Sequence, residues 1–408
     1  MKNLNCRVSG KPLNLINNFG KQPLGNGFLD KANFSNEYFF EMKTGFCDKS
    51  KMFQLLDQPN PKRMFHENYA FYSSTSSKMK KHFLNWSENI INDNNFNNNK
   101  FIIELGSNDG IFLDNLKSKN IKHLGIEPSK NVAKVSIQKG NNVVEDFFSS
   151  NLADEIVKKY GKCDYFISAN VMCHIPNITE IARGIEKCLN DKGILSFEDP
   201  YLGDVIQKVT YDQIYDEHVF LFSAHSVKNL FDKVNMELIK LEPQITHGGS
   251  MRYTLAKKGQ HQIDESVINY LDEEKKNGVD NLDRMYQFRK DVEISKLKLK
   301  NLLVNLKKEN KVIAGYAATS KSTTILNFCD IGANVIDFIC DTTPIKIGKY
   351  SPGMHIPIKN MNTFKEKKPE YSILFAWNHA EEIFEKEKDY SQKIGKWITI
   401  FPEAKIKI

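Results

Sequence analysis

Four side chains that can hold or move protons stand together in the run IYDEHVFLFSAHSV, residues 214–227. They are Tyr215, Asp216, Glu217 and His218, and the residues that follow them are mostly apolar. Ionisable and polar groups in such surroundings are costly to bury unless each has a partner. Two interpretations are open: a site for proton transfer, or a buried network of structural hydrogen bonds.

A glycine-containing loop follows the apolar run FIIEL and precedes a helix-like stretch. Glycines let a ligand approach the backbone closely, and the start of a helix favours anionic groups. The spacing Gly-x-x-x-Gly differs from the dinucleotide fingerprint Gly-x-Gly-x-x-Gly. Glu104 ends the apolar run, where it disfavours a pyrophosphate and suits the cationic amino-acid end of S-adenosylmethionine (SAM). The candidate residues of the loop are Gly106, Ser107, Asn108, Asp109 and Gly110.

Further candidates for a SAM site follow the next predicted strands in order. Glu127 ends the second strand, about twenty residues after the loop, where an acidic side chain binds ribose hydroxyls. Asp146 and Phe147 follow the third strand and are expected to bind adenine by polarity and stacking. Asn170 follows the fourth strand, beside the place expected for the sulfur of SAM. The alternative is a nucleotide-free turn with glycines for packing, but the order of loop, acid and Asp-Phe pair favours SAM.

A second glycine loop, GYAATSKS at residues 315–322, nearly matches a phosphate-binding Walker A loop. Ser320 stands where the second glycine of that motif belongs, and no Walker B partner is evident, so a kinase or an ATPase is not expected. Backbone amides, Thr319, Ser320 and Lys321 at a helix start are still suited to receive phosphates. The alternative is a structural N-cap provided by Thr319 or Ser320.

Between these motifs, short apolar strands alternate with amphipathic stretches, which indicates a mostly parallel, doubly wound α/β sheet. Residues 1–80 lack helical periodicity and are predicted to form a small β-rich module. Residues 81–260 are predicted to form the main α/β domain, residues 261–310 connecting helices, and residues 311–408 a second, smaller α/β domain.

Length and composition agree with a globular chain of two to three domains, with 408 residues, 40% of them hydrophobic and 26% charged. No apolar run reaches membrane-spanning length and the start lacks the apolar core of a signal peptide, so a cytoplasmic location is expected. The net charge of +7 comes from scattered lysines. It does not favour a nucleic-acid partner, and it suits an anionic small substrate such as a nucleotide sugar. Seven cysteines indicate free thiols in a reducing compartment.

Taken together, the motifs resemble the SAM-dependent C-methyltransferases of deoxysugar pathways, which act at C-3 of nucleotide-linked 4-keto sugars. The resemblance covers essentially the whole chain. It implies a Rossmann-like class I methyltransferase domain, SAM as cofactor, a nucleotide-diphosphate sugar as substrate and a monomeric enzyme. It is carried by GKQPLGNGF and MFHENYAFYSSTSS near the start, by ELGSNDGIFL, CHIPN, EDPYLGDVIQK, YDQIYDEHVFLFSAHSV and HGGSMRYTLAKKG in the middle, and by GYAATSKSTTILNFC, DTTPIKIGKYSPGMHIPI and LFAWNHAEEI near the end.

The resemblance also implies roles in a sugar site. A ketone at C-4 acidifies the hydrogen at C-3, and His218 is expected to remove that hydrogen as the base. Glu217 is expected to orient the imidazole or to stabilise the imidazolium that forms. Tyr215 and Tyr69 are expected to donate hydrogen bonds to the developing enolate oxygen. His174 is expected to hold a substrate hydroxyl or to act as a second acid or base.

In this family the C-terminal unit helps to hold the nucleotide diphosphate, which the resemblance assigns here to residues 319–321, with Asn378 and His379 near the same cleft. Two alternative functions remain open. One is a sugar O-methyltransferase that uses the same base on a hydroxyl, and the other is a non-catalytic nucleotide-sugar-binding protein. NAD-dependent oxidoreduction is disfavoured, because the first glycine loop lacks the required spacing.

The chain departs from the family in its N-terminal module, where members typically have two Cys-x-x-Cys pairs that bind zinc. Cys6 and Cys47 are retained here, but Ser9 and Ser50 occupy the partner positions. Hydroxyls are poor zinc ligands beside thiolates, and a structural zinc takes four strong ligands. We therefore expect no metal, and a module that is held together by packing.

Overall fold

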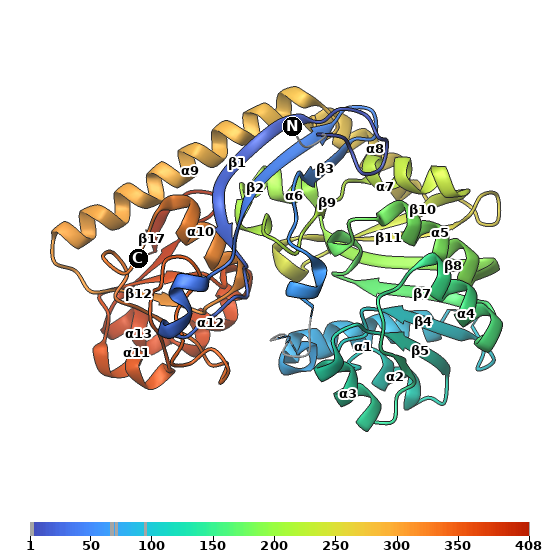
Figure 1. The fold of residues 1–408 in the computed structure, drawn as a ribbon, viewed down its shortest axis with the longest axis horizontal. Coiled ribbons are helices and arrows are strands. Elements are labelled where there is room, and N and C mark those ends of the chain that lie inside the picture. The colour runs from blue at the N-terminus through green and yellow to red at the C-terminus, as the bar shows by residue number, and fades with distance from the viewer. Residues whose placement is uncertain (1–3, 66–68, 70–71, 94–95, 408) are drawn as a thin grey trace.

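The computed structural model describes residues 4–65, 69, 72–93 and 96–407. Its strands form a four-stranded sheet near the N-terminus, a seven-stranded sheet in the middle of the chain and a six-stranded sheet near the C-terminus (Figure 1). Residues 66–68 and 70–71 of the predicted motif MFHENYAFYSSTSS lie outside the described residues. Among the helices that are described, none is both long and apolar enough to cross a membrane.

The N-terminal module is an antiparallel sheet that takes its fourth strand from the middle of the chain. The predicted β-rich module is confirmed, but the pairing of a strand from the middle of the chain with this module was not predicted. Because the fourth strand begins two residues after His218, the module holds the end of the polar run 215–218 in place. The strands of this sheet, in spatial order, are β1 (Asn14–Pro23), β2 (Phe39–Cys47), β3 (Met52–Leu55) and β9 (Phe220–Leu221).

The central sheet has the strand order β6-β5-β4-β7-β8-β11-β10. The first five strands in this order are parallel, and β11 is antiparallel to both of its neighbours. The chain winds outward from β4 in two directions, so the loops after β4 and β7 meet at the carboxyl edge, where doubly wound sheets bind ligands. The strands are β4 (Phe101–Leu105), β5 (Lys122–Ile126), β6 (Val143–Val144), β7 (Cys163–Ala169), β8 (Leu189–Pro200), β10 (Met236–Gln244) and β11 (Ser250–Lys257).

Helices between these strands bury an apolar stripe in the core of the central domain. In α5, for example, Ile178, Ile181, Ile185 and Cys188 are buried at helical spacing. The predicted alternation of strands and amphipathic helices is therefore confirmed. The helices are α1 (Ser77–Ile91), α2 (Leu113–Lys117), α3 (Lys130–Gln138), α4 (Ser150–Tyr160), α5 (Ile178–Cys188), α6 (Leu202–Lys208) and α7 (Ala224–Phe231).

Two helices, α8 (Glu265–Asn277) and α9 (Leu282–Lys308), connect the central domain to the C-terminal domain. Figure 1 shows α9 as a long arm that runs past the N-terminal module toward the C-terminal domain. One hydrophobic core joins the N-terminal module, α9 and the C-terminal domain, and it contains Phe19, Phe288 and Ile325, one from each of these parts. The N-terminal module and the C-terminal domain are thus packed together.

The C-terminal domain is a second, smaller α/β unit, as predicted. Its sheet is doubly wound, with the order β14-β13-β12-β15-β16-β17. Its strands are parallel except β17. The second glycine loop connects its first strand to α10. The strands are β12 (Ile313–Tyr316), β13 (Phe338–Cys340), β14 (Ile358–Lys359), β15 (Tyr371–Leu374), β16 (Lys396–Thr399) and β17 (Lys405–Lys407). The helices are α10 (Ser320–Cys329), α11 (Met361–Lys367), α12 (Ala380–Lys386) and α13 (Lys388–Lys393).

Candidate active site

A cavity of about 370 Å³ lies where the two glycine loops meet the polar run 215–218. The N-terminal module and the loop after β15 complete its walls. Predicted site residues that line this cavity are Tyr69, Gly106, Asn108, Glu127, Phe147, Asn170, His174, Tyr215, Glu217, His218, Thr319, Ser320, Lys321, Asn378 and His379. Predicted residues outside its lining are Glu104, Ser107, Asp109, Gly110 and Asp146.

The first glycine loop brings its backbone to the cavity wall. Gly106 has φ +73°, and a Cβ atom added there would collide with Val171, so a larger residue would block the approach. The Asn108 amide donates to Glu127 Oε2 at 3.0 Å, and the Ser129 amide donates to Oε1 at 2.8 Å. These bonds fix a carboxyl group whose pKa is raised by burial. Two fixed acceptor oxygens on a cavity wall suit the hydroxyls of a ribose.

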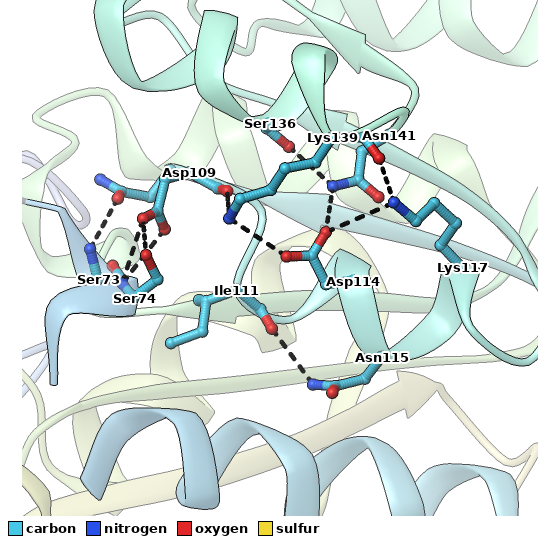
Figure 2. Close-up of polar contacts among 11 residues, drawn as sticks. Ser73, Ser74, Asp109, Ile111, Asp114, Asn115, Lys117, Ser136, Lys139 and Asn141 are labelled. Carbon is cyan, nitrogen blue, oxygen red and sulfur yellow. Dashed lines mark hydrogen bonds and ion pairs between the residues drawn. The ribbon is translucent and has the colours of Figure 1, made fainter. Parts of the chain in front are cut away.

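Asp109 attaches the segment that contains Ser73 and Ser74 to the glycine loop (Figure 2). It does not line the cavity. Its carboxylate accepts from the backbone amide and the hydroxyl of Ser74, and Asn108 Oδ1 accepts from the Ser73 amide at 3.0 Å. The Asp109 carbonyl oxygen accepts from Lys139 Nζ at 2.7 Å. Asp109 thus docks the SSTSS run in this structure, and its role in binding SAM stays a prediction.

Gly110 is needed for close packing beside the same loop. It has φ +83°, and an added Cβ atom would collide with Ser136 and Asn141. Asn141 Nδ2 donates to Asp114 Oδ1 at 2.8 Å and to Ser136 Oγ at 3.2 Å, and Lys139 forms an ion pair with Asp114 at 3.2 Å (Figure 2). The structure gives Gly110 a packing role, because this polar network occupies the space of a side chain.

The remaining three predicted residues outside the lining also differ from expectation. Glu104 is buried in β4, where desolvation and the charge of Glu127 raise its pKa well above the usual range. That shift favours a neutral carboxyl, which does not match the anion predicted for a cationic ligand. Ser107 is buried against Gly125, where a Cβ atom would meet its hydroxyl. Asp146 is exposed, and its carboxylate accepts from the Phe147 amide at 2.7 Å.

Phe147 and Asn170 have the features expected around a bound nucleoside. Phe147 lines the cavity and is 39% exposed, so its ring is open for stacking. Asn170 has φ +55°, which is unusual for a residue with a side chain, and its amide donates to the Glu198 carbonyl oxygen at 2.7 Å. Its buried Oδ1 atom has no partner among the described residues, which leaves an acceptor for a ligand.

His218 is held as a neutral base. Its Nδ1 lies 2.7 Å from the Gln213 carbonyl oxygen, which can only accept, so Nδ1 carries the proton. Its Nε2 lies 2.8 Å from Tyr215 Oη and accepts from that hydroxyl. Burial lowers the pKa of His218 well below the usual range, and His174 and Lys321 lower it further. The cavity is therefore lined by an imidazole whose Nε2 is unprotonated.

The predicted role of Glu217 in stabilising the imidazolium stays a prediction, but Glu217 does not orient the imidazole of His218 in this structure. The Gln213 carbonyl has that role, and Glu217 Oε1 instead accepts from Asn26 Nδ2 at 2.8 Å. Burial and the neighbouring Glu217 raise the pKa of Tyr69 well above the usual range, so Tyr69 keeps its proton and can donate. Sequence reasoning missed Gln213 and Asn26, although both stand inside quoted motifs. A backbone acceptor such as the Gln213 carbonyl leaves no sequence signal.

His174 stacks on His218, with ring centroids 5.3 Å apart and ring planes 22° apart. Burial lowers the pKa of His174 to about 3, and its Nε2 has no partner in the described part of the chain. The sulfur of Cys173 and one ring nitrogen of each histidine lie within 4.8 Å of one another, close enough to hold a metal ion. However, burial raises the pKa of Cys173 well above the usual range, which disfavours the thiolate that metal binding needs.

The second glycine loop forms both an N-cap and part of the cavity wall. Thr319 Oγ1 accepts from the Ser322 amide at 3.0 Å and so caps α10, while Thr319 also lines the cavity. The structural and the binding interpretations of this residue are therefore compatible. Burial lowers the pKa of Lys321, whereas the nearby carboxyl groups of Asp212 and Glu217 raise it. Lys321 is thus the cationic side chain of this loop in the cavity wall.

Four side chains converge in the N-terminal module at the positions of the two Cys-x-x-Cys pairs. Cys6 Sγ lies 3.1 Å from Ser50 Oγ, and Ser9 Oγ lies 3.2 Å from Cys47 Sγ. The backbone amides of Val8 and Ser9 each donate to Cys6 Sγ at 3.4 Å. Both cysteines and Ser50 are buried. Thiol–hydroxyl hydrogen bonds therefore join the two turns that the pairs would otherwise join through a metal.

Sequence comparisons match three family models in order along the chain. Residues 6–65 match a putative zinc binding domain, residues 82–241 a methyltransferase domain, and residues 245–402 a C-methyltransferase C-terminal domain. C-methyltransferase NovU from Streptomyces niveus is 26% identical over 405 residues, which cover 98% of this chain and 96% of NovU.

Solved structures resemble the chain only weakly. An S-adenosylmethionine-dependent methyltransferase from Clostridium acetobutylicum ATCC 824 is 10% identical, covers 44% of this chain and 92% of its own, and has a TM-score of 0.36. Magnesium protoporphyrin IX methyltransferase ChlM from Synechocystis PCC 6803, with bound SAM, is 11% identical, covers 44% and 79%, and has a TM-score of 0.33. At such low TM-scores, the assignment of the chain to a class of enzyme depends on the sequence matches.

The central α/β domain and its cavity, together with the match over residues 82–241, define a SAM-dependent methyltransferase. The match over residues 245–402 and the similarity to NovU over 98% of the chain narrow this class to the SAM-dependent C-methyltransferases, which the chain resembles over almost its whole length. The cavity fits SAM at Gly106, Glu127, Phe147 and Asn170, where close backbone approach, fixed acceptors, an open ring and an unpartnered oxygen coincide.

The N-terminal module does not fit the zinc that its family model implies. Two thiols and two hydroxyls converge there, and the hydroxyls already bind the thiols. A structural zinc takes four strong ligands, of which this site provides two. No step of the reaction depends on this module as a metal centre.

Proposed function

We propose that this enzyme transfers a methyl group from SAM to C-3 of a nucleotide-linked 4-keto deoxysugar. The observation that carries the proposal is the unprotonated Nε2 of His218 on the cavity wall. Methylation of a carbon beside a ketone requires removal of a carbon-bound proton, and a neutral imidazole is a base suited to that task. The C-methyltransferase match of residues 245–402 supports carbon as the acceptor over oxygen.

The proposed chemistry begins at the hydrogen of C-3, which the C-4 carbonyl acidifies. His218 Nε2 takes this proton, and the electron pair moves into the carbonyl to give an enolate oxygen. Tyr215 and Tyr69 are the hydroxyl donors for that oxygen, and both line the cavity. Bound SAM would supply the electrophilic methyl group: the enolate carbon would form the new C–C bond as the sulfonium S–CH3 bond breaks, the C-4 ketone would form again and S-adenosylhomocysteine would leave. Gln213 keeps its hydrogen bond to His218 Nδ1 throughout, so the proton is accepted at Nε2.

A second cavity, of about 250 Å³, supports an anionic substrate. Arg63, Lys346 and Lys349 line it, and it shares Tyr69 and Glu217 with the first cavity. A substrate can therefore extend from the base into cationic surroundings. Guanidinium and ammonium groups are the usual partners of phosphate oxygens, which matches the diphosphate of a nucleotide sugar.

We also propose that the enzyme acts as a monomer in the cytoplasm on an activated sugar. All seven cysteines are free and buried in the structure, which agrees with a reducing compartment. This location would place the enzyme beside the pool of nucleotide sugars that its proposed substrate belongs to.

The test is incubation of the enzyme with SAM and a panel of nucleoside-diphosphate 4-keto deoxysugars, followed by mass spectrometry and NMR of the products. We expect one added methyl group, attached to carbon C-3. A methoxy signal would show methyl transfer to oxygen and overturn the proposal in favour of a sugar O-methyltransferase. Binding of nucleotide sugar and SAM without turnover would favour the non-catalytic function.

The Lys349→Ala variant tests the second cavity separately. We expect KM for the nucleotide sugar to rise roughly tenfold or more from loss of a charge-assisted contact, while the affinity for SAM stays unchanged. The control is Lys298→Ala, because Lys298 forms a surface ion pair with Glu403 at 2.6 Å and lines neither cavity. Equal KM values for the two variants would contradict the assignment.

A further inference from the structure

The C-terminal domain holds both chain neighbours of Gln213. Trp377, in the loop after β15, donates its indole Nε1–H to Asp212 Oδ2 at 2.6 Å. Thr324, on α10, donates its hydroxyl to the Ile214 carbonyl oxygen at 2.9 Å. Neither Trp377 nor Thr324 lines either cavity. Trp377 therefore holds the side chain of Asp212 and Thr324 holds the backbone of Ile214, and neither is placed to contact a ligand in those cavities.

The residue between these two anchors determines the proton position on the base. The Gln213 carbonyl oxygen accepts from His218 Nδ1–H at 2.7 Å. Asp212, Gln213 and Ile214 are each no more than 2% exposed, and Gln213 ends a short 3-10 helix. The Gln213 side chain is also fixed, because its Nε2 donates to the His247 carbonyl oxygen. A rotation of the Gln213 peptide group would remove the acceptor that fixes the tautomer of His218.

The indole of Trp377 can reach Asp212 because residue 248, which lies against the indole ring, is a glycine. Gly248 packs directly on the Trp377 ring, and a Cβ atom added at Gly248 would overlap that ring. Gly248 has φ +87°, in the left-handed region that favours glycine. The ring also forms an edge contact with Phe401, with centroids 5.7 Å apart. Trp377 is thus wedged between the two domains with its N–H directed at Asp212.

From this arrangement we infer that Trp377 and Thr324 are positioning residues for the base: by anchoring Asp212 and Ile214, they keep the Gln213 carbonyl aimed at His218 Nδ1. The imidazole then presents a lone pair at Nε2. The other tautomer would present an N–H group to the substrate, and a nitrogen that already carries a proton cannot accept another one. In this way the C-terminal domain keeps His218 in the tautomer that can accept a proton, in addition to any role in binding substrate. The inference rests on the proposed function, in which His218 is that base.

The test uses the full-length chain with Trp377→Phe, which keeps a ring and removes the N–H, and with Thr324→Val, which keeps the shape and removes the hydroxyl. The downfield imidazole N–H proton of His218 is followed by NMR in 15N-histidine-labelled protein, and its loss in His218→Gln assigns the signal. Methyl transfer is measured alongside. Tyr316→Phe is the control, because Tyr316 donates to Glu387 Oε1 at 2.9 Å within the same domain.

We expect both variants to lose or broaden the Nδ1–H signal of His218 and to lower kcat on the order of tenfold or more, as misplacement of catalytic groups does. SAM affinity and KM for the sugar should change less than about threefold, since neither residue lines the cavities. Thr324→Ser keeps a hydroxyl and should therefore have the signal and the kcat that Thr324→Val loses. The comparison of these two variants also tests the inference if Trp377→Phe folds poorly. Tyr316→Phe should resemble the wild type.

Two results would overturn the inference: an unchanged Nδ1–H signal in both variants, or a lower kcat with the signal intact. A third pattern separates it from the proposed function. If the signal is lost and kcat is retained, Trp377 and Thr324 do position the imidazole, but His218 is not the base.

Discussion

The Tyr215 hydroxyl donates to Nε2 of His218 across 2.8 Å, and both side chains line the same cavity. The bond involves the nitrogen that is free of a proton, because the other nitrogen, Nδ1, donates its N–H to the Gln213 carbonyl oxygen. It also marks where a substrate proton would arrive, because a ligand at this wall can take over the hydroxyl while Nε2 accepts from the ligand. Tyr215 and His218 therefore form one hydrogen-bonded pair. The predictions about catalysis depend on the protonation state of the His218 imidazole.

The pH dependence of kcat/KM should reflect the buried state of His218. Burial holds its pKa well below the usual range, so the free enzyme keeps a neutral base through mildly acidic pH. We expect kcat/KM at about pH 6 to remain close to its value at pH 7, whereas a base with an ordinary histidine pKa of about 6.5 would already be mostly protonated. A midpoint of the acid limb near pH 6.5 would contradict this state of His218.

His174 should make the protein less stable as the pH falls. Its pKa is lowered to about 3 in the fold, against about 6.5 in the unfolded chain. Between these values the unfolded state binds a proton that the folded state does not, so stability is present above pH 6.5 and is lost on acidification. Relative to His174→Gln, the wild type should lose about 1–2 kcal/mol between about pH 7 and pH 5. Urea unfolding at both pH values measures this difference. A pH-independent difference would contradict it.

Glu127 should contribute to SAM affinity, whereas Asp146 should not. The Glu127 carboxyl is fixed on the cavity wall, and Asp146 lies outside the lining. Glu127→Ala should weaken SAM binding by roughly 1.5–3 kcal/mol through loss of charge-assisted hydrogen bonds. Asp146→Ala is the matched control and should change binding by less than about 0.5 kcal/mol. Calorimetric titration with SAM separates the two, and equal affinities for Glu127→Ala and the wild type would remove Glu127 from the site.

The N-terminal module should fold without zinc. Elemental analysis of purified protein should find far less than one zinc per chain, and a chelator should leave the melting temperature unchanged. The converse change is informative, because Ser9 and Ser50 already contact Cys47 and Cys6. Replacing both serines by cysteine should create a four-thiolate site that binds zinc. One tightly held zinc in the native protein would show that other ligands are recruited.

The sequence predicted the parts of the site that depend on local pattern. Gly106, Glu127 and Asn170 each follow an apolar strand, and parallel strands bring their carboxyl ends to one edge. Periodicity and spacing were therefore sufficient to place these three residues around one cavity. The same reasoning made Asp109 and Gly110 candidates for SAM binding, but the structure places both outside the cavity lining, because neighbouring positions in one loop can face different neighbours.

Features that arise from tertiary packing could not be predicted. The pairing of β9 with β3 joins residues far apart in the chain, and β9 has only two residues, too few for a periodicity signal. The acceptor that orients His218 is a backbone carbonyl, which any residue at position 213 would provide. The contact between Trp377 and Asp212 spans two domains. Each of these depends on how separate parts dock, and that information is not local.

The most direct test of the proposed mechanism is single-turnover methyl transfer by His218→Asn, with SAM affinity measured on the same sample. Loss of a general base typically costs about 10²–10⁴-fold in rate, so we predict a rate at least a hundredfold below that of the wild type. The affinity for SAM should be unchanged, because the residues that fit SAM lie elsewhere in the cavity. A rate within about tenfold of the wild type, in a variant that still binds SAM, would contradict the claim that His218 removes the proton.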